Sequence, residues 1–262
     1  MVKRSGEGAM QSDRAMPGPA GLSAVFVESW AAMLADAPGE PPVRLGACAA
    51  DADIPAGLRR RLGPLARMGV ACGLGIAPEG DADIVFCSRY GDLSLAHQLL
   101  AALVATEPMS PAGFSMSVHN AVPGVLDLAR KARIGHTAIA AGAQTFSAGL
   151  AEAWLRLGER PHLRLVLVFA DLPLPDIYRQ FADEDAGGAA FALRLSAEPG
   201  EARAVSITRS AAGDASPAAL ENPPAELLVR RLVDSLCSDA PALSWRSQGS
   251  LWRLGKSSDE AA

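Results

Sequence analysis

Segments typical of buried β-strands alternate with segments typical of helices along most of this chain. The clearest strand is HLRLVLVFAD at 162–171, whose near-continuous apolar run is typical of a central strand buried on both faces. Shorter strands are predicted at 22–30 and 84–87, and helical segments separate them. This alternation predicts a layered α/β fold.

Apolar residues at helical spacing predict helices in the segments between these strands. PAGLRRRLGPLARMGVACGLGI at 55–76 is predicted as one helix that bends near Pro64. LSLAHQLLAALVA at 93–105 is predicted as a second, apolar helix, and 114–133 as a helical region broken near Pro123. The other predicted elements are strands at 137–142, 189–197 and 202–208, a helix between the first two of these, a helix at 224–237, and a docked segment at 243–256.

Composition restricts the class of protein. The chain has 262 residues, of which 49% are apolar and 20% charged, as in an ordinary folded protein. We expect one domain at 21–255 between disordered tails at 1–20 and 256–262, because the first tail cannot bury enough apolar area to offset its chain entropy. The net charge of -5 supplies no global positive field, which argues against a general nucleic-acid binder.

No apolar run approaches the roughly 18–20 residues of a membrane helix, and the opening MVKRSGEGAMQSDRAMPGPAG lacks the apolar core of a signal peptide. The four cysteines have irregular spacing with no CxxC pair: Cys48, Cys72, Cys87 and Cys237. This spacing indicates neither a zinc site nor a disulfide framework. We therefore expect a cytoplasmic protein with no metal, no cofactor and no membrane contact.

The stretch GHTAIAAGAQTFSAGLAEA at 135–153 joins a small, β-like half to a helical half. Many enzymes mount a nucleophile on such a strand-to-helix turn. Here the turn consists of Gly142, Ala143 and Gln144, and it offers neither Cys nor Ser. The chain is therefore either an enzyme whose reactive residue lies elsewhere or an enzyme-like frame without the reaction.

The segment SPAGFSMSVHNAVPGVLDLARKARIGHTAIAAGAQTFSAGLAEA at 110–153 resembles the corresponding segment of β-ketoacyl synthases, the condensing enzymes of fatty acid and polyketide synthesis. FCSRYGDL, LVLVFAD and GGAAFALRL resemble core strands of the synthase amino-terminal half, so the wider match runs from 25 to 195. FSxSVHNAxxG with VFADLPLPDIY is similar to short ketosynthase-like proteins of aryl polyene pathways, which behave as chain-length-factor partners. The resemblance implies a layered thiolase-like fold, mostly the amino-terminal half of a ketosynthase.

The departure from the synthases concerns the reaction itself. In register, the synthase nucleophilic Cys falls at Ala143, with Gln144 as its neighbour, and a methyl group cannot hold an acyl thioester. Cys87 lies on a predicted buried strand and Cys237 on a late helix, so neither replaces it. The resemblance places two catalytic histidines in the second thiolase half, and no His follows His162. We predict no condensing activity in this chain alone.

The resemblance also implies a partner. Synthase-type subunits pair through the strand before the nucleophile, and preceding residues reach across to line the partner's acyl tunnel. The corresponding positions are Phe114, Met116, Asn120, Thr137 and Ile139. A bulky Phe at a tunnel end would stop a growing chain by volume exclusion, although Phe114 and Met116 are equally compatible with plain core packing.

Two basic runs are candidates for docking an acidic acyl carrier protein. The residues are Arg59, Arg60, Arg130, Lys131 and Arg133. A solvated helix face explains them equally well. A carrier protein is accordingly a possible second partner in this hypothesis.

The most economical hypothesis is a non-catalytic ketosynthase-like subunit that pairs with an active β-ketoacyl synthase. One alternative is an acyl-transfer enzyme whose site is completed by a partner chain. Another is a stand-alone module that binds acyl carrier protein. In the same segment His119 is interpreted as a structural residue rather than a catalytic one, since Ser117 is not placed to pair with it.

Overall fold

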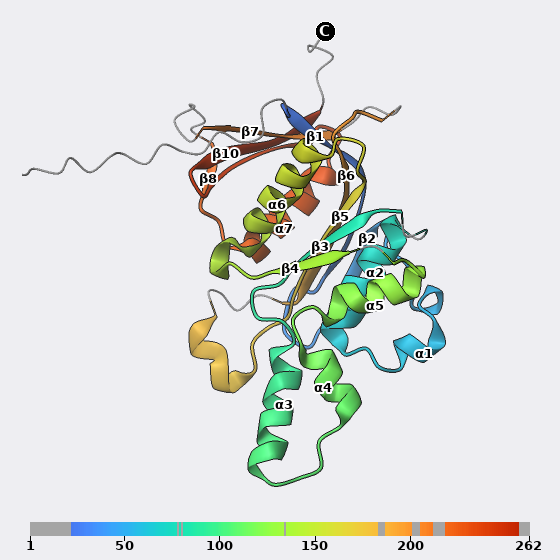
Figure 1. The fold of residues 1–262 in the computed structure, drawn as a ribbon. Helices are drawn as coiled ribbons and strands as arrows, with labels where there is room; N and C mark the ends of the chain where they lie inside the picture. The colour runs from blue at the N-terminus through green and yellow to red at the C-terminus, as the bar shows by residue number, and fades with distance from the viewer. Residues whose placement is uncertain are drawn as a thin grey trace, which may run out of the picture.

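The structure is a computed structural model that describes residues 22–77, 79, 81–133, 135–182, 187–200, 205–211 and 218–256. Its strands form one mixed sheet in the order β4-β3-β5-β6-β1-β7-β10-β9-β8, with β2 paired to β1 (Figure 1). In chain order the strands are β1 (Ala24–Leu34), β2 (Val43–Gly46), β3 (Asp83–Cys87), β4 (His136–Ile139), β5 (Leu165–Asp171), β6 (Ala189–Ser196), β7 (Val205–Ala211), β8 (Leu220–Glu221), β9 (Ala242–Ser247) and β10 (Ser250–Lys256).

Three neighbouring strands, β4, β3 and β5, run parallel to one another. Ile84 on β3 lies opposite His136 on β4 and Val166 on β5. The next strand, β6, is antiparallel, and its Phe191 lies opposite Phe169 of β5. Every residue of β5 is buried, which confirms the prediction made from its apolar run. Parallel strands need crossover connections, and this requirement explains the alternation of strands and helices in the sequence.

The helices cover both faces of the sheet. In chain order they are α1 (Ala56–Arg59), α2 (Pro64–Ile76), α3 (Leu93–Val104), α4 (Pro111–Ser117), α5 (Ala121–Arg130), α6 (Thr145–Glu159) and α7 (Ala225–Leu236). On one face, α2 and α5 pack their apolar side chains, among them Val70 and Leu126, against Ile84 and Val168 of the sheet. On the other face, α6 and α7 pack against β5, β6 and the carboxy-terminal strands.

The sheet bends around α6 and α7, so that these two helices lie between its two halves (Figure 1). Phe146 of α6 contacts Phe169 of β5 and Phe191 of β6, with ring centroids 6.2 and 5.8 Å apart. On the other side Trp154 of α6 meets Trp252 of β10 edge to face at 5.8 Å. Aromatic side chains bury large apolar areas, so these contacts stabilise the central helical layer.

The carboxy-terminal segment at 243–256 is docked, as predicted, and it forms a hairpin of β9 and β10. Trp245 and Trp252 lie opposite each other in this hairpin and stack at 6.2 Å. Lys256, assigned to a disordered tail from the sequence, is the last residue of β10. The predicted tails at 1–20 and 257–262 lie outside the described residues.

Two helix predictions are wrong in detail. Pro64 does not bend a single helix: it is the first residue of α2, where its missing N–H leaves no hydrogen bond unmade. The break predicted near Pro123 falls earlier, between Ser117 and Ala121, and Pro123 lies in the first turn of α5 for the same reason.

The helices α3 and α4 form an arm that extends from one end of the sheet (Figure 1). Neither helix contains a buried residue, although α3 is one of the most apolar segments of the chain. We refer to residues 93–118 as the α3–α4 arm.

No helix within the described residues has the length and apolar character needed to cross a membrane.

Candidate functional site

The carboxyl ends of the parallel strands β3, β4 and β5 meet at one edge of the sheet (Figure 1). In sheets of this kind ligands bind beyond the carboxyl ends of the strands. The residues at this edge are Ser88 after β3, the turn at 140–144 after β4, and Asp171 at the end of β5. The turn is thus at the position where a reactive group would be useful.

The turn after β4 is held by its own hydrogen bonds. The hydroxyl of Thr145 accepts from the amide of Ala141 at 2.9 Å and donates to the carbonyl of Gly142 at 2.7 Å. Gly142 has φ +57°, a left-handed conformation that glycine adopts without strain. The strand predicted to run to Gly142 ends earlier, at Ile139, because residues 142–144 form a 3-10 turn.

Ala143 lies in the middle of this turn and is half-buried. Its methyl group can neither attack a carbonyl nor hold an acyl group. That Ala143 occupies the place of the synthase nucleophile stays a prediction. The position at the end of a parallel strand and before a long helix is the one that this prediction requires.

Gln144 ties the turn to the carboxy-terminal part of the fold. Its side-chain amide donates to the carbonyls of Asn222 at 3.0 Å and Pro223 at 3.3 Å, and its side-chain oxygen accepts from the hydroxyl of Ser247. All of these partners lie in the segment that precedes α7 or at the end of β9. Gln144 therefore has a structural role in which its polar atoms are all engaged.

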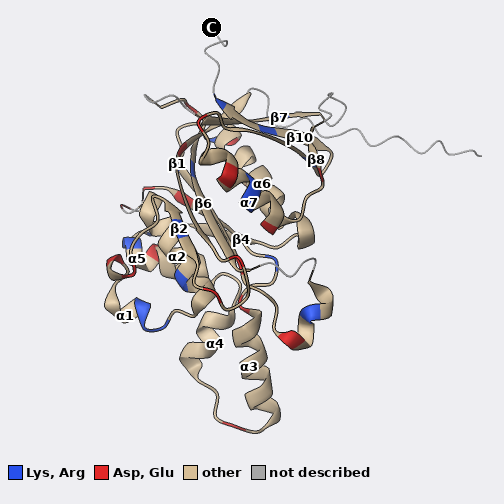
Figure 2. Ribbon diagram, turned by 180° about the vertical axis from the view of Figure 1, so that it is seen from behind, with Lys and Arg blue, Asp and Glu red and all other residues tan. Residues whose placement is uncertain are grey.

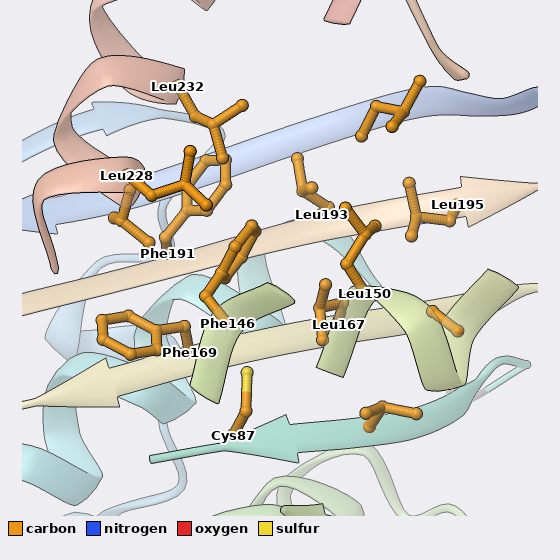
Figure 3. Packing of buried hydrophobic residues seen from close by; sticks show 14 of the residues in the cluster. Cys87, Phe146, Leu150, Leu167, Phe169, Phe191, Leu193, Leu195, Leu228 and Leu232 are labelled. Carbon is orange, nitrogen blue, oxygen red and sulfur yellow. The ribbon is translucent and has the colours of Figure 1, made fainter. Parts of the chain in front are cut away.

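Cys87 is the last residue of β3, and Figure 3 shows its thiol pointing into the layer formed by Phe146, Phe169 and Leu167. It is fully buried and donates to the carbonyl of Val168 at 3.5 Å. Burial, and to a lesser degree the nearby Asp171 carboxylate, raises the pKa of this thiol well above its usual value. The Cys87 thiol is therefore poorly suited to be a nucleophile.

A buried polar cluster, which sequence reasoning missed, lies beside the turn. The Asp171 carboxylate accepts from the hydroxyl of Ser88 at 2.7 Å and from the amide of Arg89 at 2.9 Å. Burial raises the pKa of Asp171 from 3.8 to about 6, against the hydrogen bonds from Arg89, Ser88 and Tyr90, which lower it. The sequence feature that could have identified this cluster is Asp171 itself, an Asp at the carboxyl end of an otherwise apolar strand.

Ser88, His119 and Asp171 are the residue types of a hydrolytic triad, but their geometry is different. The Ser88 hydroxyl donates to Asp171 and accepts from the amide of Gly91 at 2.8 Å. The His119 ring donates through Nε2 to the backbone carbonyl of Ser88 at 2.8 Å and not to its hydroxyl. No base activates the serine in this arrangement. This hydrogen bond of His119 agrees with its interpretation from the sequence as a structural residue.

A small cavity of about 100 Å³ opens next to this cluster. It is lined by Asp171 and Arg89 on one side and by Pro224, Glu226 and Arg230 at the start of α7 on the other. Glu226 and Arg230 form an ion pair at 3.3 Å, and both lie partly in solvent. The cavity is much smaller than the pockets of about 300–1,000 Å³ that hold drug-sized ligands. Within the described part of the chain, no three His, Cys, Asp or Glu side chains gather as a metal site would require.

The structure separates the predicted interface residues into two groups. Phe114 is 61% exposed on the α3–α4 arm, whereas Met116 is half-buried and lines, with the exposed Asn120, one side of a hollow of about 340 Å³. Thr137 accepts a hydrogen bond from Arg156 of α6. Ile139 packs at the margin of the core beneath α6. The side chains of Thr137 and Ile139 therefore lie on the α6 side of the sheet, and Met116 lies on the opposite side.

The predicted carrier-docking residues also differ in their exposure. Arg60, Lys131 and Arg133 are exposed, and Arg59 donates to the carbonyl of Asp51 at 2.9 Å. The prediction is wrong for Arg130, which is buried and donates to the carbonyl of Ala82 at 2.9 Å. An arginine buried in this way cannot contact a surface partner.

Comparison with known proteins agrees with the fold. The sequence model described as β-ketoacyl synthase, N-terminal domain, matches residues 28–253. A search of curated proteins found no match. Among solved structures, the complex of the ketosynthase ApeO with its chain length factor ApeC from Xenorhabdus doucetiae contains a similar chain, with a TM-score of 0.63 and 24% identity over 90% of this chain and 100% of that one.

Two further similar structures have lower identity. The ishigamide ketosynthase/chain length factor has a TM-score of 0.57 and 11% identity, over 88% of this chain and 98% of that one. The complex AntDE:AntF, a type II acyl-carrier protein with its ketosynthase bound to the hexaketide, has a TM-score of 0.52 and 12% identity, over 73% of this chain and 70% of that one. These similarities show a thiolase-like ketosynthase fold, and because the family match covers most of its length, this chain belongs to the β-ketoacyl synthase N-terminal domain family.

Proposed function

We propose that this chain is a non-catalytic ketosynthase subunit of the chain-length-factor type. In this proposal it pairs with an active β-ketoacyl-acyl-carrier-protein synthase in polyene or fatty-acid-like biosynthesis. The observation that carries the proposal is Ala143, whose methyl group occupies the turn after β4, while the thiol of Cys87 on β3 is buried and unreactive. Two of the similar structures are pairs of a ketosynthase and a chain length factor.

The α3–α4 arm supports pairing because it exposes apolar side chains. Six of the eleven large hydrophobic side chains that are exposed in the described residues belong to it: Leu100, Leu103, Val104, Met109, Phe114 and Val118. Figure 2 shows that the arm is almost free of charged residues, and Glu107 is its one charged side chain. Interface centres are depleted of charge in the same way, so we assign this surface to the synthase partner.

The unpaired side of the outer strand β4 offers a second contact. Among the described strands β4 pairs with β3 alone, and its other side is an edge. Proteins normally protect such edges with charged residues or prolines, but β4 reads His-Thr-Ala-Ile. In a parallel pair the N–H and C=O of one residue point to the same side. Since the Ile139 carbonyl accepts from Ser88, we infer that Ala138 directs its backbone groups outward to the partner's strand.

Co-expression with a candidate ketosynthase from the same genome tests the proposal. We expect one complex with a 1:1 ratio by size-exclusion chromatography with light scattering, and acyl groups on the synthase alone by intact-mass analysis after incubation with acyl carrier protein. An acyl adduct on this chain would instead support the partner-completed acyl-transfer enzyme. A monomer that binds carrier protein but no synthase would support the stand-alone module.

Carrier-protein docking is a secondary part of the proposal. We now assign it to the exposed Arg60, Lys131 and Arg133, because Arg130 is buried and Arg59 is half-buried and hydrogen-bonded to the carbonyl of Asp51. Such docking would weaken as salt screens the attraction. We keep the cytoplasm as the proposed location.

A further inference from the structure

Cys48 and Cys72 lie side by side in a part of the molecule that the proposed function does not use. Cys48 belongs to the loop after β2 and Cys72 to the middle of α2, and their Sγ atoms are 4.0 Å apart. The irregular spacing of the cysteines in the sequence gives no sign of this contact. All four cysteines are free thiols in the structure.

The backbone around this pair fixes the loop on α2 and on β1. The amide of Ala49 donates to the carbonyl of Ala71 at 3.1 Å, and the amide of Ala47 donates to the carbonyl of Trp30 at 2.9 Å. A Cβ atom at Gly75 would lie 1.9 Å from the carbonyl oxygen of Ala47, so only glycine permits this close approach. The contact between the two thiols is therefore built into the packing of the loop on α2.

The two thiols have unequal surroundings. Cys48 is half-buried, whereas Cys72 is fully buried and lies 3.9 Å from the carbonyl of Ala190. A hydrogen bond from Cys72, together with the charge of Arg44, lowers the pKa of Cys48 despite its partial burial and the nearby Asp51. Burial raises the pKa of Cys72 well above its usual value. Cys48 is therefore the thiol that an oxidant reaches first and the one that ionises more readily.

We propose that Cys48 and Cys72 form a reversible disulfide in response to hydrogen peroxide. The Cys48 thiolate attacks one peroxide oxygen, the O–O bond breaks, and the sulfur becomes a sulfenic acid as the other oxygen leaves as water after protonation. The Cys72 sulfur then attacks the Cys48 sulfur, the S–O bond breaks, and a second water leaves. Two thiols are oxidised and one peroxide is reduced to two waters. A thiol reductant such as glutathione reverses the reaction.

Formation of the bond requires only a local movement. The sulfur atoms must approach from 4.0 Å to about 2.05 Å, a change that side-chain rotation and a small shift of the loop can supply. Arg44 holds the same loop through a hydrogen bond to the carbonyl of Ala49 at 2.9 Å. The disulfide would fasten the loop after β2 covalently to α2 and restrict the unfolded chain.

The test uses the purified full chain, reduced, freed of reductant and then treated with hydrogen peroxide. We expect a mass loss of about 2 Da, a proteolytic peptide that joins Cys48 to Cys72, and a higher Tm, all reversed by glutathione. Cys237→Ser serves as the matched control because Cys237 is exposed and does not belong to the Cys48–Cys72 pair. That variant should form the same disulfide.

Two variants separate the steps. Cys72→Ser should stop at the sulfenic acid, which dimedone labels on Cys48, and Cys48→Ser should show no internal disulfide. The proposal is overturned if both thiols of the native chain still react with an alkylating reagent after oxidation and denaturation. Oxidation of Cys48 to sulfinic acid without a bond to Cys72, or disulfide-linked dimers that form while Cys48 and Cys72 both stay reduced, would equally contradict it.

Discussion

The side-chain amide of Gln144 lies 3.0 Å from the carbonyl oxygen of Asn222 and joins the turn after β4 to the segment that leads into α7. A second hydrogen bond reaches Pro223, and Ser247 donates to the other side-chain atom of Gln144. The residue next to the predicted nucleophile position therefore connects the amino-terminal part of the fold with its carboxy-terminal part.

Gln144→Ala should lower the free energy of unfolding by about 1–2 kcal/mol, because three partners lose a hydrogen bond and two of them are backbone carbonyls. Urea denaturation followed by circular dichroism measures this change. The matched control is Gln180→Ala at an exposed position, which should leave stability within about 0.5 kcal/mol of the native chain. Equal effects of the two substitutions would contradict the structural role of Gln144.

Ala143→Cys places a thiol in the turn and tests whether the missing nucleophile is the only missing part. We expect the new thiol to react with iodoacetamide, since Ala143 is half-buried and not fully enclosed. We expect no condensation, because no His follows His162 and the His119 ring is bonded to the Ser88 carbonyl. The assay is release of carbon dioxide from malonyl-carrier protein, in a Cys237→Ser background. Release that depends on the introduced thiol would show that the chain holds a complete site.

Leu103→Glu tests the α3–α4 arm as the surface for the synthase. Leu103 is 57% exposed, so the substitution should leave the Tm of the isolated chain unchanged, but burial of an unpaired carboxylate in the complex should weaken binding at least about tenfold. Val43→Glu on β2 is the matched control because Val43 is 58% exposed and lies outside the arm. Binding is measured by titration calorimetry with the ketosynthase. Full retention of affinity by Leu103→Glu would remove the arm from the interface.

Phe114→Ala tests whether this residue limits the length of the partner's product. Phe114 is 61% exposed on α4, so it is free to enter a tunnel of the neighbouring subunit, where its ring would exclude further carbon atoms. We expect the reconstituted pair to make longer products, as measured by mass spectrometry of the carrier-bound chains. Phe181→Ala is the control, since Phe181 is 59% exposed and lies outside α4. An unchanged distribution of product lengths would show that Phe114 does not limit the length of the product.

Much of the fold follows from local patterns in the sequence. The run from Leu165 to Asp171 is apolar at every position but the last, which is typical of a strand covered on both faces. The hairpin at the carboxyl end was less evident, because its turn, Gln248-Gly249, with φ values of +51° and +70°, has Gln at a position where Asn, Asp or Gly is usual. A two-residue turn of this kind before a Trp-bearing strand is the signal that could have identified it.

Burial and the site depend on contacts that no local pattern encodes. The helix at 93–105 was predicted from its leucines, but their spacing gave no indication that Leu100 and Leu103 would be exposed, because apolar periodicity does not identify what covers a helix. Asp171 and Ser88 lie 83 residues apart and meet only because β3 and β5 are neighbours in the sheet. Arg130 is buried for a similar reason, since its partner Ala82 precedes β3.

Asp171 makes the stability of the protein depend on pH in a particular direction. Burial raises its pKa from 3.8 in the unfolded chain to about 6 in the folded protein. Between these values the folded state keeps a proton that the unfolded state has lost, so the contribution of Asp171 is full below pH 3.8 and declines as pH rises through about 6. The decline is roughly 3 kcal/mol, because each pKa unit corresponds to about 1.4 kcal/mol.

Asp171→Asn removes this titration while it preserves the size of the side chain. We expect the free energy of unfolding of the native chain, minus that of the variant, to fall by roughly 2–3 kcal/mol between pH 4 and pH 7. Urea titrations at half-unit steps of pH measure this difference, and other carboxylates cancel because both proteins contain them. Asp176→Asn, at an exposed position, should follow the native curve in parallel. If the Asp171→Asn curve is also parallel to the native one, the carboxyl is not held protonated by its burial, and the cluster with Ser88 and Arg89 is then strong enough to keep it ionised.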